Sequence, residues 1–221
     1  MNVDEAWREI DAYRLNLIEV LSGLSGEDWR QPSLCAGWTV REALAHLTYQ
    51  HIDAGTALSG FVRARGNSDR MIHDVACRRA ARLSTVELIG LLKAMVGSRR
   101  HPPGVTWREG ITDNLVHGQD ITVPLGQRLD LPVGASAIAA ERNYSMKWPP
   151  MPKGWPFHPR RGLRRFRLRA TDTDWTAGEG PEVTAQIGDL LLLITGRLVV
   201  LPRLSGPGAD ELTAALTGQR V

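Results

Sequence analysis

The stretch that decides the fold of this chain is Trp38-Thr39-Val40-Arg41-Glu42-Ala43-Leu44-Ala45-His46-Leu47. Thr39 followed three residues later by Glu42 is a capping box, in which each side chain hydrogen-bonds the backbone N–H of the other residue. Apolar residues then recur at helical spacing, at Val40, Ala43, Leu44 and Leu47. His46 lies among these core positions, where a polar side chain without a partner is costly. The stretch predicts a helix that runs to about Arg63 and buries a histidine.

A second polar pair follows further along the chain, in Asp113-Asn114-Leu115-Val116-His117. Side chains at positions i and i+4 project from one face of a helix about one turn apart, so both reach a single ion. Two imidazoles and one carboxylate suit zinc or a related divalent ion with an open coordination position. We therefore predict His46, Asp113 and His117 as metal ligands, although each alone also fits an ordinary hydrogen-bonded side chain.

Three further residues near the first helix are candidates for supporting roles. Gln50, one turn after His46, is a candidate for orienting a ligand or bound water, with a solvated glutamine as the alternative. Arg41, like the basic residues of segment 64–82, is a candidate for holding an anionic group of the substrate. His51 is an alternative metal ligand.

A rival arrangement starts from the doublet His73-Asp74. With His46 or His51 upstream and Asp113 or Asp120 downstream, the doublet has the ligand order of helical metal phosphohydrolases. Two-residue motifs often arise by chance, and residues 70–79 are too polar for a core helix. A short helix over 73–79 is the simpler interpretation.

Working outward, helical periodicity covers residues 4–24, 84–96, 107–123 and 132–144. Ser84 and Glu87 form a second capping box. The period changes at residues 165–170, where Phe166, Leu168 and Ala170 alternate with arginines, as in a half-buried strand. Residues 183–201 are mostly apolar and predicted to be helical, with Gly196 near the end, and a last short helix covers 208–217. The chain is therefore mainly α with a small α+β C-terminal region.

The segment Trp148–Gly162 contains five prolines and is predicted to be a linker. We expect a helical bundle over 1–147, the Pro-rich linker over 148–162, and the small α+β region over 163–221. Trp155 and its aromatic neighbours make the linker apolar in places. We expect it either to close over the site as a lid, with Trp155 near the substrate, or to cross the far side of the bundle.

Composition narrows the functional classes. At 221 residues, 43% of them hydrophobic, the chain is long enough to bury one large core. The formal charge is only +3. The arginines over 160–169 alternate with apolar residues, which favours a solvated strand face over nucleic-acid binding. The apolar run Leu190–Ile194 is far too short to cross a bilayer. The acidic first residues lack a signal pattern, so we expect a cytoplasmic protein without nucleic-acid or membrane partners.

A resemblance to a known family rests on three stretches. Residues 29–47 read Trp29-Arg30-Gln31-Pro32-Ser33-Leu34-Cys35-Ala36-Gly37 and continue through the helix quoted above. This block resembles the N-terminal signature of the mycothiol-dependent maleylpyruvate isomerase family. The block from Asp113 to Ile121, followed by Pro124-Leu125-Gly126, is similar to the same family. So is the C-terminal part from Leu168 to Gly178, with Gly180-Pro181 and Thr195-Gly196-Arg197.

The resemblance implies a DinB/YfiT-like four-helix bundle that binds a divalent metal and uses mycothiol, the low-molecular-weight thiol of actinobacteria. It assigns the family's metal histidines to His46 and His117 and its carboxylate to Asp113, where the isomerase has the longer Glu. We expect an enzyme that joins a metal-activated thiol to a small electrophile, by S-transfer or by isomerisation. A non-catalytic metal- or thiol-binding protein is the alternative, and a homodimer is a possible assembly.

Overall fold

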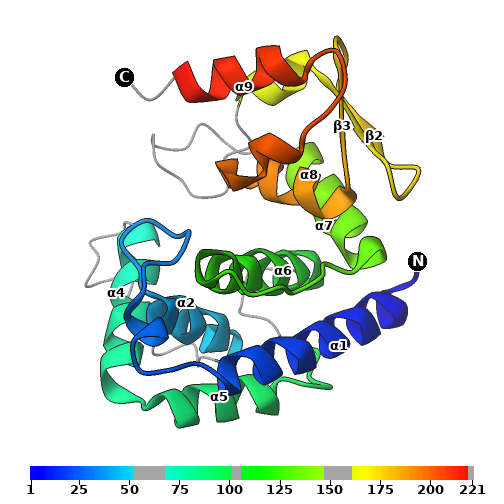
Figure 1. Ribbon diagram of the computed structural model, residues 1–221. Coiled ribbons are helices and arrows are strands. Elements are labelled where there is room, and N and C mark those ends of the chain that lie inside the picture. Colours follow the sequence, from blue (N-terminus) through cyan, green and yellow to red (C-terminus); the bar gives the residue numbers. More distant parts are fainter. Residues whose placement is uncertain (52–67, 101–105, 147–160, 219–221) are drawn as a thin grey trace. The chain divides into compact units, whose positions relative to one another are not determined.

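The computed structural model describes residues 1–51, 68–100, 106–146 and 161–218 (Figure 1). These residues form two compact units, Met1–Leu131 and Pro132–Val221. The helix over residues 133–145 therefore belongs to the second unit, whereas the sequence analysis grouped it with the bundle. Most of the predicted Pro-rich linker, including Trp155, lies outside the described residues, so its expected role as a lid remains a prediction.

Four helices of the first unit form a closed ring of contacts: α1 (Val3–Ser22), α5 (Thr85–Ala94), α2 (Val40–Leu47) and α6 (Trp107–Thr122). Each helix contacts the next one, and α6 in turn contacts α1. A fifth helix, α4 (Ser68–Arg82), packs on α2. The described residues of this unit also include the 3-10 turns η1 (Asp28–Arg30), η2 (Thr48–His51) and η3 (Val123–Leu125). The ring confirms the predicted four-helix bundle.

Capping boxes start the helices of the ring. Both predicted boxes are present, and Glu42 and Glu87 accept hydrogen bonds from the backbone N–H groups of Thr39 and Ser84, both at 2.7 Å. Matching boxes that the sequence analysis did not single out start α1 and α6, at Asn2 with Glu5 and at Thr106 with Glu109. Each such cap stabilises its helix by about 1 kcal/mol.

Two helices differ in length from the predictions. The α-helical part of α2 ends at Leu47, and the chain continues as the 3-10 turn η2; the remainder of the predicted helix falls outside the described residues. In contrast, α4 is longer than the predicted 73–79. Its inner face buries Val75, Ala76 and Ala80, so packing against α2 supports a sequence that looks too polar for a core helix.

The most deeply enclosed helix of this unit is α6. From Gly110 to Thr122 every residue except Asp113 is buried. On one side, the buried Arg14 of α1 donates to Asn114 Oδ1 at 2.9 Å and to the backbone oxygen of Met95 at 2.7 Å. A buried guanidinium needs such partners, because an unpaired charge in a core is costly. Arg14 thereby fixes α1 to α6 and to the end of α5.

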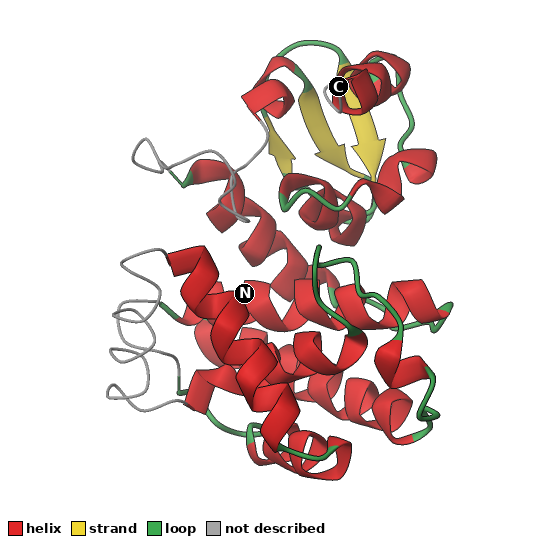
Figure 2. Ribbon diagram, turned by 90° about the vertical axis from the view of Figure 1, so that its left-hand side faces the viewer, coloured by secondary structure: helices red, strands yellow, loops and turns green. Residues whose placement is uncertain are grey.

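The second unit combines helices with a three-stranded sheet (Figure 2). The strands are β1 (Arg167–Ala170), β2 (Thr176–Ala177) and β3 (Glu182–Ala185), in the order β2-β1-β3. β1 pairs antiparallel with β2 and parallel with β3. The helices are α7 (Val133–Ser145), α8 (Ile187–Ile194) and α9 (Ala209–Thr217), with the 3-10 turns η4 (Arg161–Arg165) and η5 (Leu198–Arg203). α7 packs on α8, α8 contacts β1, and α9 contacts β3.

The predicted strand at residues 165–170 is confirmed, since Phe166, Leu168 and Ala170 are buried and the arginines between them are exposed. The prediction of one helical segment over 183–201 is wrong at its start. Residues 182–185 pair with β1 as β3, and the helix begins only at Ile187, whose N–H donates to Asp172 Oδ1 at 2.8 Å.

Close packing of α1 on α6 leads to a first prediction. A Cβ at Gly118 would lie 2.3 Å from Tyr13 Oη and 2.8 Å from Tyr13 Cε1. Tyr13 is 2% exposed and its hydroxyl donates to the backbone oxygen of Leu115, so the ring has little room to move. We expect Gly118→Ala to lower the free energy of unfolding by about 1–3 kcal/mol through overpacking.

The matched control is Gly90→Ala in α5, where an added Cβ meets nothing within 4 Å. Alanine favours the helix over glycine, so this variant should gain about 0.4–1 kcal/mol. Urea denaturation of both variants measures the difference. Equal stabilities would contradict the described contact between α1 and α6.

Candidate functional site

The structure brings the three predicted ligand residues together. His46 of α2 and the pair Asp113 and His117 of α6 each offer a ligand atom, and these atoms all lie within 4.8 Å of one another. The two imidazole rings meet edge to face, with centroids 4.6 Å apart. His117 is buried, whereas His46 and Asp113 are partly exposed. His117 therefore lies at the inner end of the site, and the two partly exposed side chains lie nearer to solvent.

Asp120, one turn after His117, sets the orientation of that imidazole. Its Oδ2 lies 2.9 Å from His117 Nδ1, and Asp120 is 0% exposed. With the Nδ1 proton donated to the carboxylate, the lone pair of Nε2 remains available to a metal. Metal-binding histidines are commonly held by such a carboxylate, which fixes both tautomer and ring orientation. The residues therefore fit a divalent ion bound by two imidazoles and one carboxylate.

The electrostatics of His117 depend on the same neighbours. Burial disfavours the charged imidazolium and lowers its pKa. Electrostatic interaction with Cys35 and hydrogen bonds with Asp120 and Cys35 outweigh burial, and together they raise the pKa of His117 from 6.5 to about 10. A divalent ion that binds this imidazole therefore has to displace a proton.

The indole of Trp38 forms an apolar wall beside the histidines. Its ring centroid lies 5.0 Å from that of His46 and 6.2 Å from that of His117. Trp38 is 9% exposed, and its Nε1 has no hydrogen-bond partner among the described residues. The wall excludes water from one side of the cluster and leaves a buried donor beside it.

Of the predicted supporting residues, only Arg41 has a described side chain. Its Nη2 donates to the backbone oxygen of Leu83 at 2.6 Å, which fastens α2 to the segment between α4 and α5. The side chains of Gln50 and His51, and all of Trp155, lie outside the described residues. Their suggested roles therefore stay predictions.

The rival doublet lies on α4. The His73 ring is 6.3 Å from that of Trp38, and His73 Nδ1 is 3.6 Å from Asp74 Oδ1. Among the side chains that the structure describes, no group of three potential ligands includes His73 or Asp74. The described part of the site therefore offers no support for the phosphohydrolase arrangement.

Sequence reasoning assigned no role at the site to Cys35 or Trp38, and weighed Asp120 only as a metal ligand of the rival arrangement. Asp120 follows His117 by three residues and so lies on the same helix face, a spacing that could have indicated a supporting carboxylate. Cys35 and Trp38 reach the site through a loop fold, for which helical periodicity gives no signal.

These features define a class of protein: a helical bundle in which facing helices present two histidines and a carboxylate to one small site. Residues 10–103 match the family model of the mycothiol maleylpyruvate isomerase N-terminal domain. The match confirms the predicted resemblance over this part of the chain. The matched range includes His46 and ends before α6 begins.

Two solved structures extend the comparison along the chain. The mycothiol-dependent maleylpyruvate isomerase is 15% identical, with a TM-score of 0.59 over 89% of this chain and 90% of that one. A histidine-to-alanine mutant of that isomerase is 13% identical, with a TM-score of 0.60 over 95% of this chain and 94% of the other. At such identities the similarity shows the fold alone. No curated protein matches the chain.

Within the described ranges, none of the helices combines the length and the hydropathy needed to cross a bilayer.

The geometry of the cluster leads to a second prediction. We expect His46→Ala to lose bound zinc, because it removes one of three donors. The fall in affinity should exceed the roughly 10–100-fold that loss of a supporting hydrogen bond costs. Helical content should remain, since the apolar faces of the helices build the core. Zinc affinity is measured by competition with a chromophoric chelator, and helicity by circular dichroism.

The matched control is His73→Ala, which removes another histidine beside the same Trp38 ring but outside the ligand group. This variant should keep its zinc. If both variants bind zinc as the parent does, His46 is not a ligand; if only His73→Ala loses it, the ligand set is misassigned.

Proposed function

We propose that this protein is a metal-dependent enzyme that uses mycothiol to act on a small electrophilic substrate. The observation that carries the proposal is the convergence of His46, Asp113 and His117 in a chain whose N-terminal part matches the family model of the mycothiol maleylpyruvate isomerase N-terminal domain. Zinc is the metal that this donor set suits best. When bound there, the ion supplies positive charge that favours the thiolate form of a coordinating thiol.

The residues of the chain provide binding, orientation and exclusion of water. Asp120 keeps the His117 ring fixed, so the donor atoms stay in place while substrates exchange. Trp38 closes one side with an apolar surface, which strengthens electrostatic attraction between the site and a thiolate. The partly exposed Asp113 marks the side from which the thiol and the electrophile enter.

Two outcomes of thiol attack on an electrophile are compatible with this site. Addition followed by elimination of the same thiol isomerises the substrate, whereas addition without elimination leaves an S-conjugate. Asp113 is one methylene shorter than the Glu of the isomerase. A shorter carboxylate leaves more room beside the ion, so we favour conjugation or another S-transfer over maleylpyruvate isomerisation.

The test is thiol-dependent consumption of an electrophile by the purified, zinc-loaded protein. Maleylpyruvate and an activated haloaromatic compound are each incubated with the protein and mycothiol. The masses of the products are measured by mass spectrometry. We expect turnover that needs both zinc and mycothiol. A product with the mass of thiol plus maleylpyruvate, or of thiol plus haloaromatic less the hydrogen halide released, identifies a transferase. A maleylpyruvate product of unchanged mass identifies an isomerase.

His117→Ala should abolish this turnover, while His73→Ala should retain it. Zinc and mycothiol binding without turnover of either substrate would favour the non-catalytic alternative. Turnover that is equal with and without zinc would overturn the proposal.

A further inference from the structure

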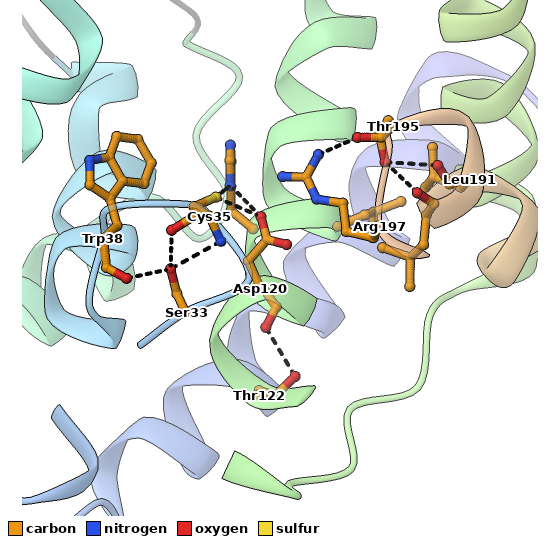
Figure 3. A network of polar contacts seen from close by, with 12 residues as sticks. Ser33, Cys35, Trp38, Asp120, Thr122, Leu191, Thr195 and Arg197 are labelled. Carbon is orange, nitrogen blue, oxygen red and sulfur yellow. Dashed lines mark hydrogen bonds and ion pairs between the residues drawn. The ribbon is translucent and has the colours of Figure 1, made fainter. Parts of the chain in front are cut away.

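A second group of potential ligands consists of Cys35, His117 and Asp120, and Figure 3 shows Cys35 beside Asp120. Cys35 Sγ is 3.0 Å from Asp120 Oδ2 and 3.4 Å from His117 Nδ1, and the latter two atoms are 2.9 Å apart. Two of these contacts are made by Nδ1 of His117, and the third joins Cys35 to Asp120 directly. The group therefore shares the His117 imidazole with the first cluster and faces its Nδ1 edge.

The loop over residues 33–38 holds the cysteine in place. Ser33 Oγ donates to the backbone oxygen of Trp38 at 2.9 Å and accepts from the N–H of Cys35 at 3.2 Å. Gly37 takes a left-handed conformation, with φ of +82°, that closes the turn. Leu34 N–H donates to the backbone oxygen of Asp120 at 3.0 Å, which ties the loop to α6. The sulfur is thus fixed beside the carboxylate.

The donor chemistry suits a thiophilic ion. Metal–donor distances of about 2.0–2.3 Å place the donors of one tetrahedral ion roughly 3–4 Å apart. The three donor atoms of this group already lie close to that spacing, so a small expansion admits an ion. Sulfur, imidazole nitrogen and carboxylate oxygen together bind zinc, and the thiolate adds affinity for softer ions such as cadmium.

We propose that Cys35, His117 and Asp120 form a second metal position, for a thiophilic divalent ion, and that it excludes simultaneous binding at the His46, Asp113 and His117 position. A neutral imidazole has one lone pair. An ion at Nδ1 displaces the proton from that nitrogen and leaves the remaining ring proton on Nε2, which removes His117 as a donor to the first position. The thiol proton of Cys35 is released to water on binding.

This inference goes beyond the proposed function, because it needs neither mycothiol nor turnover. It assigns Cys35 and Asp120 a role in choosing between ions. A soft ion bound at the second position takes His117 away from the first one. Such ions are therefore expected to inactivate the first position by binding Cys35, Asp120 and the shared His117.

The test is binding of cobalt(II) and cadmium(II) to the full-length, metal-free protein. Binding is monitored by the sulfur-to-metal charge-transfer absorption band. We expect this band in the parent protein. It should disappear in Cys35→Ser and Cys35→Ala, and persist in His46→Ala and Asp113→Asn, which leave the second group intact. Circular dichroism checks that each variant is folded.

The matched control is Cys77→Ser, which removes the other cysteine of the chain. Cys77 Sγ lies 3.8 Å from His73 Nδ1 on α4, so it could hold a soft ion by itself. The band should persist in Cys77→Ser. A band that is absent from the parent, or that follows Cys77 instead of Cys35, overturns the proposal.

Whether the two metal positions exclude each other is tested by adding cadmium to the zinc-loaded protein. We expect one zinc to be released for each cadmium bound in the parent protein, with growth of the sulfur band. Cys35→Ser should keep its zinc at the same cadmium concentration. Simultaneous binding of one ion of each kind would overturn the exclusion. Failure of the proposed function would instead show as missing turnover with the sulfur band intact.

Discussion

The contact between α1 and α6 is the constraint on which the rest of the first unit depends. α6 carries three of the side chains that build the candidate site, so its position and rotation decide where they meet α2. Two residues of α1 fix both the position and the rotation of α6. Arg14 reaches Asn114, the residue after Asp113, and the Tyr13 ring lies against Gly118, the residue after His117. A buried charge and a close steric fit therefore act next to the ligand pair.

Local sequence patterns predicted much of this arrangement. Capping boxes and helical spacing located the helices of the bundle, and the i, i+4 spacing placed Asp113 and His117 on one face. Other features depend on tertiary contacts that no local pattern records. The short strand β3 exists because it pairs with β1, and α4 is long because α2 covers its apolar face. Buried Arg14 is stabilised by Asp11 of its own helix and by partners that come from two other helices.

In the candidate site, too, some residues are predicted by local sequence patterns and others are placed only by tertiary contacts. His46 was found because a histidine among core positions is unusual, whereas Cys35 lies in an irregular loop between helices. Its place beside Asp120 follows from hydrogen bonds that join residues distant in sequence, such as that of Leu34 N–H with the backbone of Asp120. Helical periodicity thus predicts the group of His46, Asp113 and His117, whereas the group that contains Cys35 forms only when the loop packs against α6.

The unpartnered indole N–H of Trp38 has a thermodynamic consequence for the ligand-free protein. Within the described part of the chain this buried donor has no hydrogen-bond acceptor, and a buried donor left without one costs about 1–3 kcal/mol. Where no acceptor reaches this N–H, the fold is less stable by this amount than its apolar packing alone would make it. Any bound molecule that brings an acceptor to Trp38 recovers the difference as affinity, so the same atom lowers the melting temperature and tightens the complex.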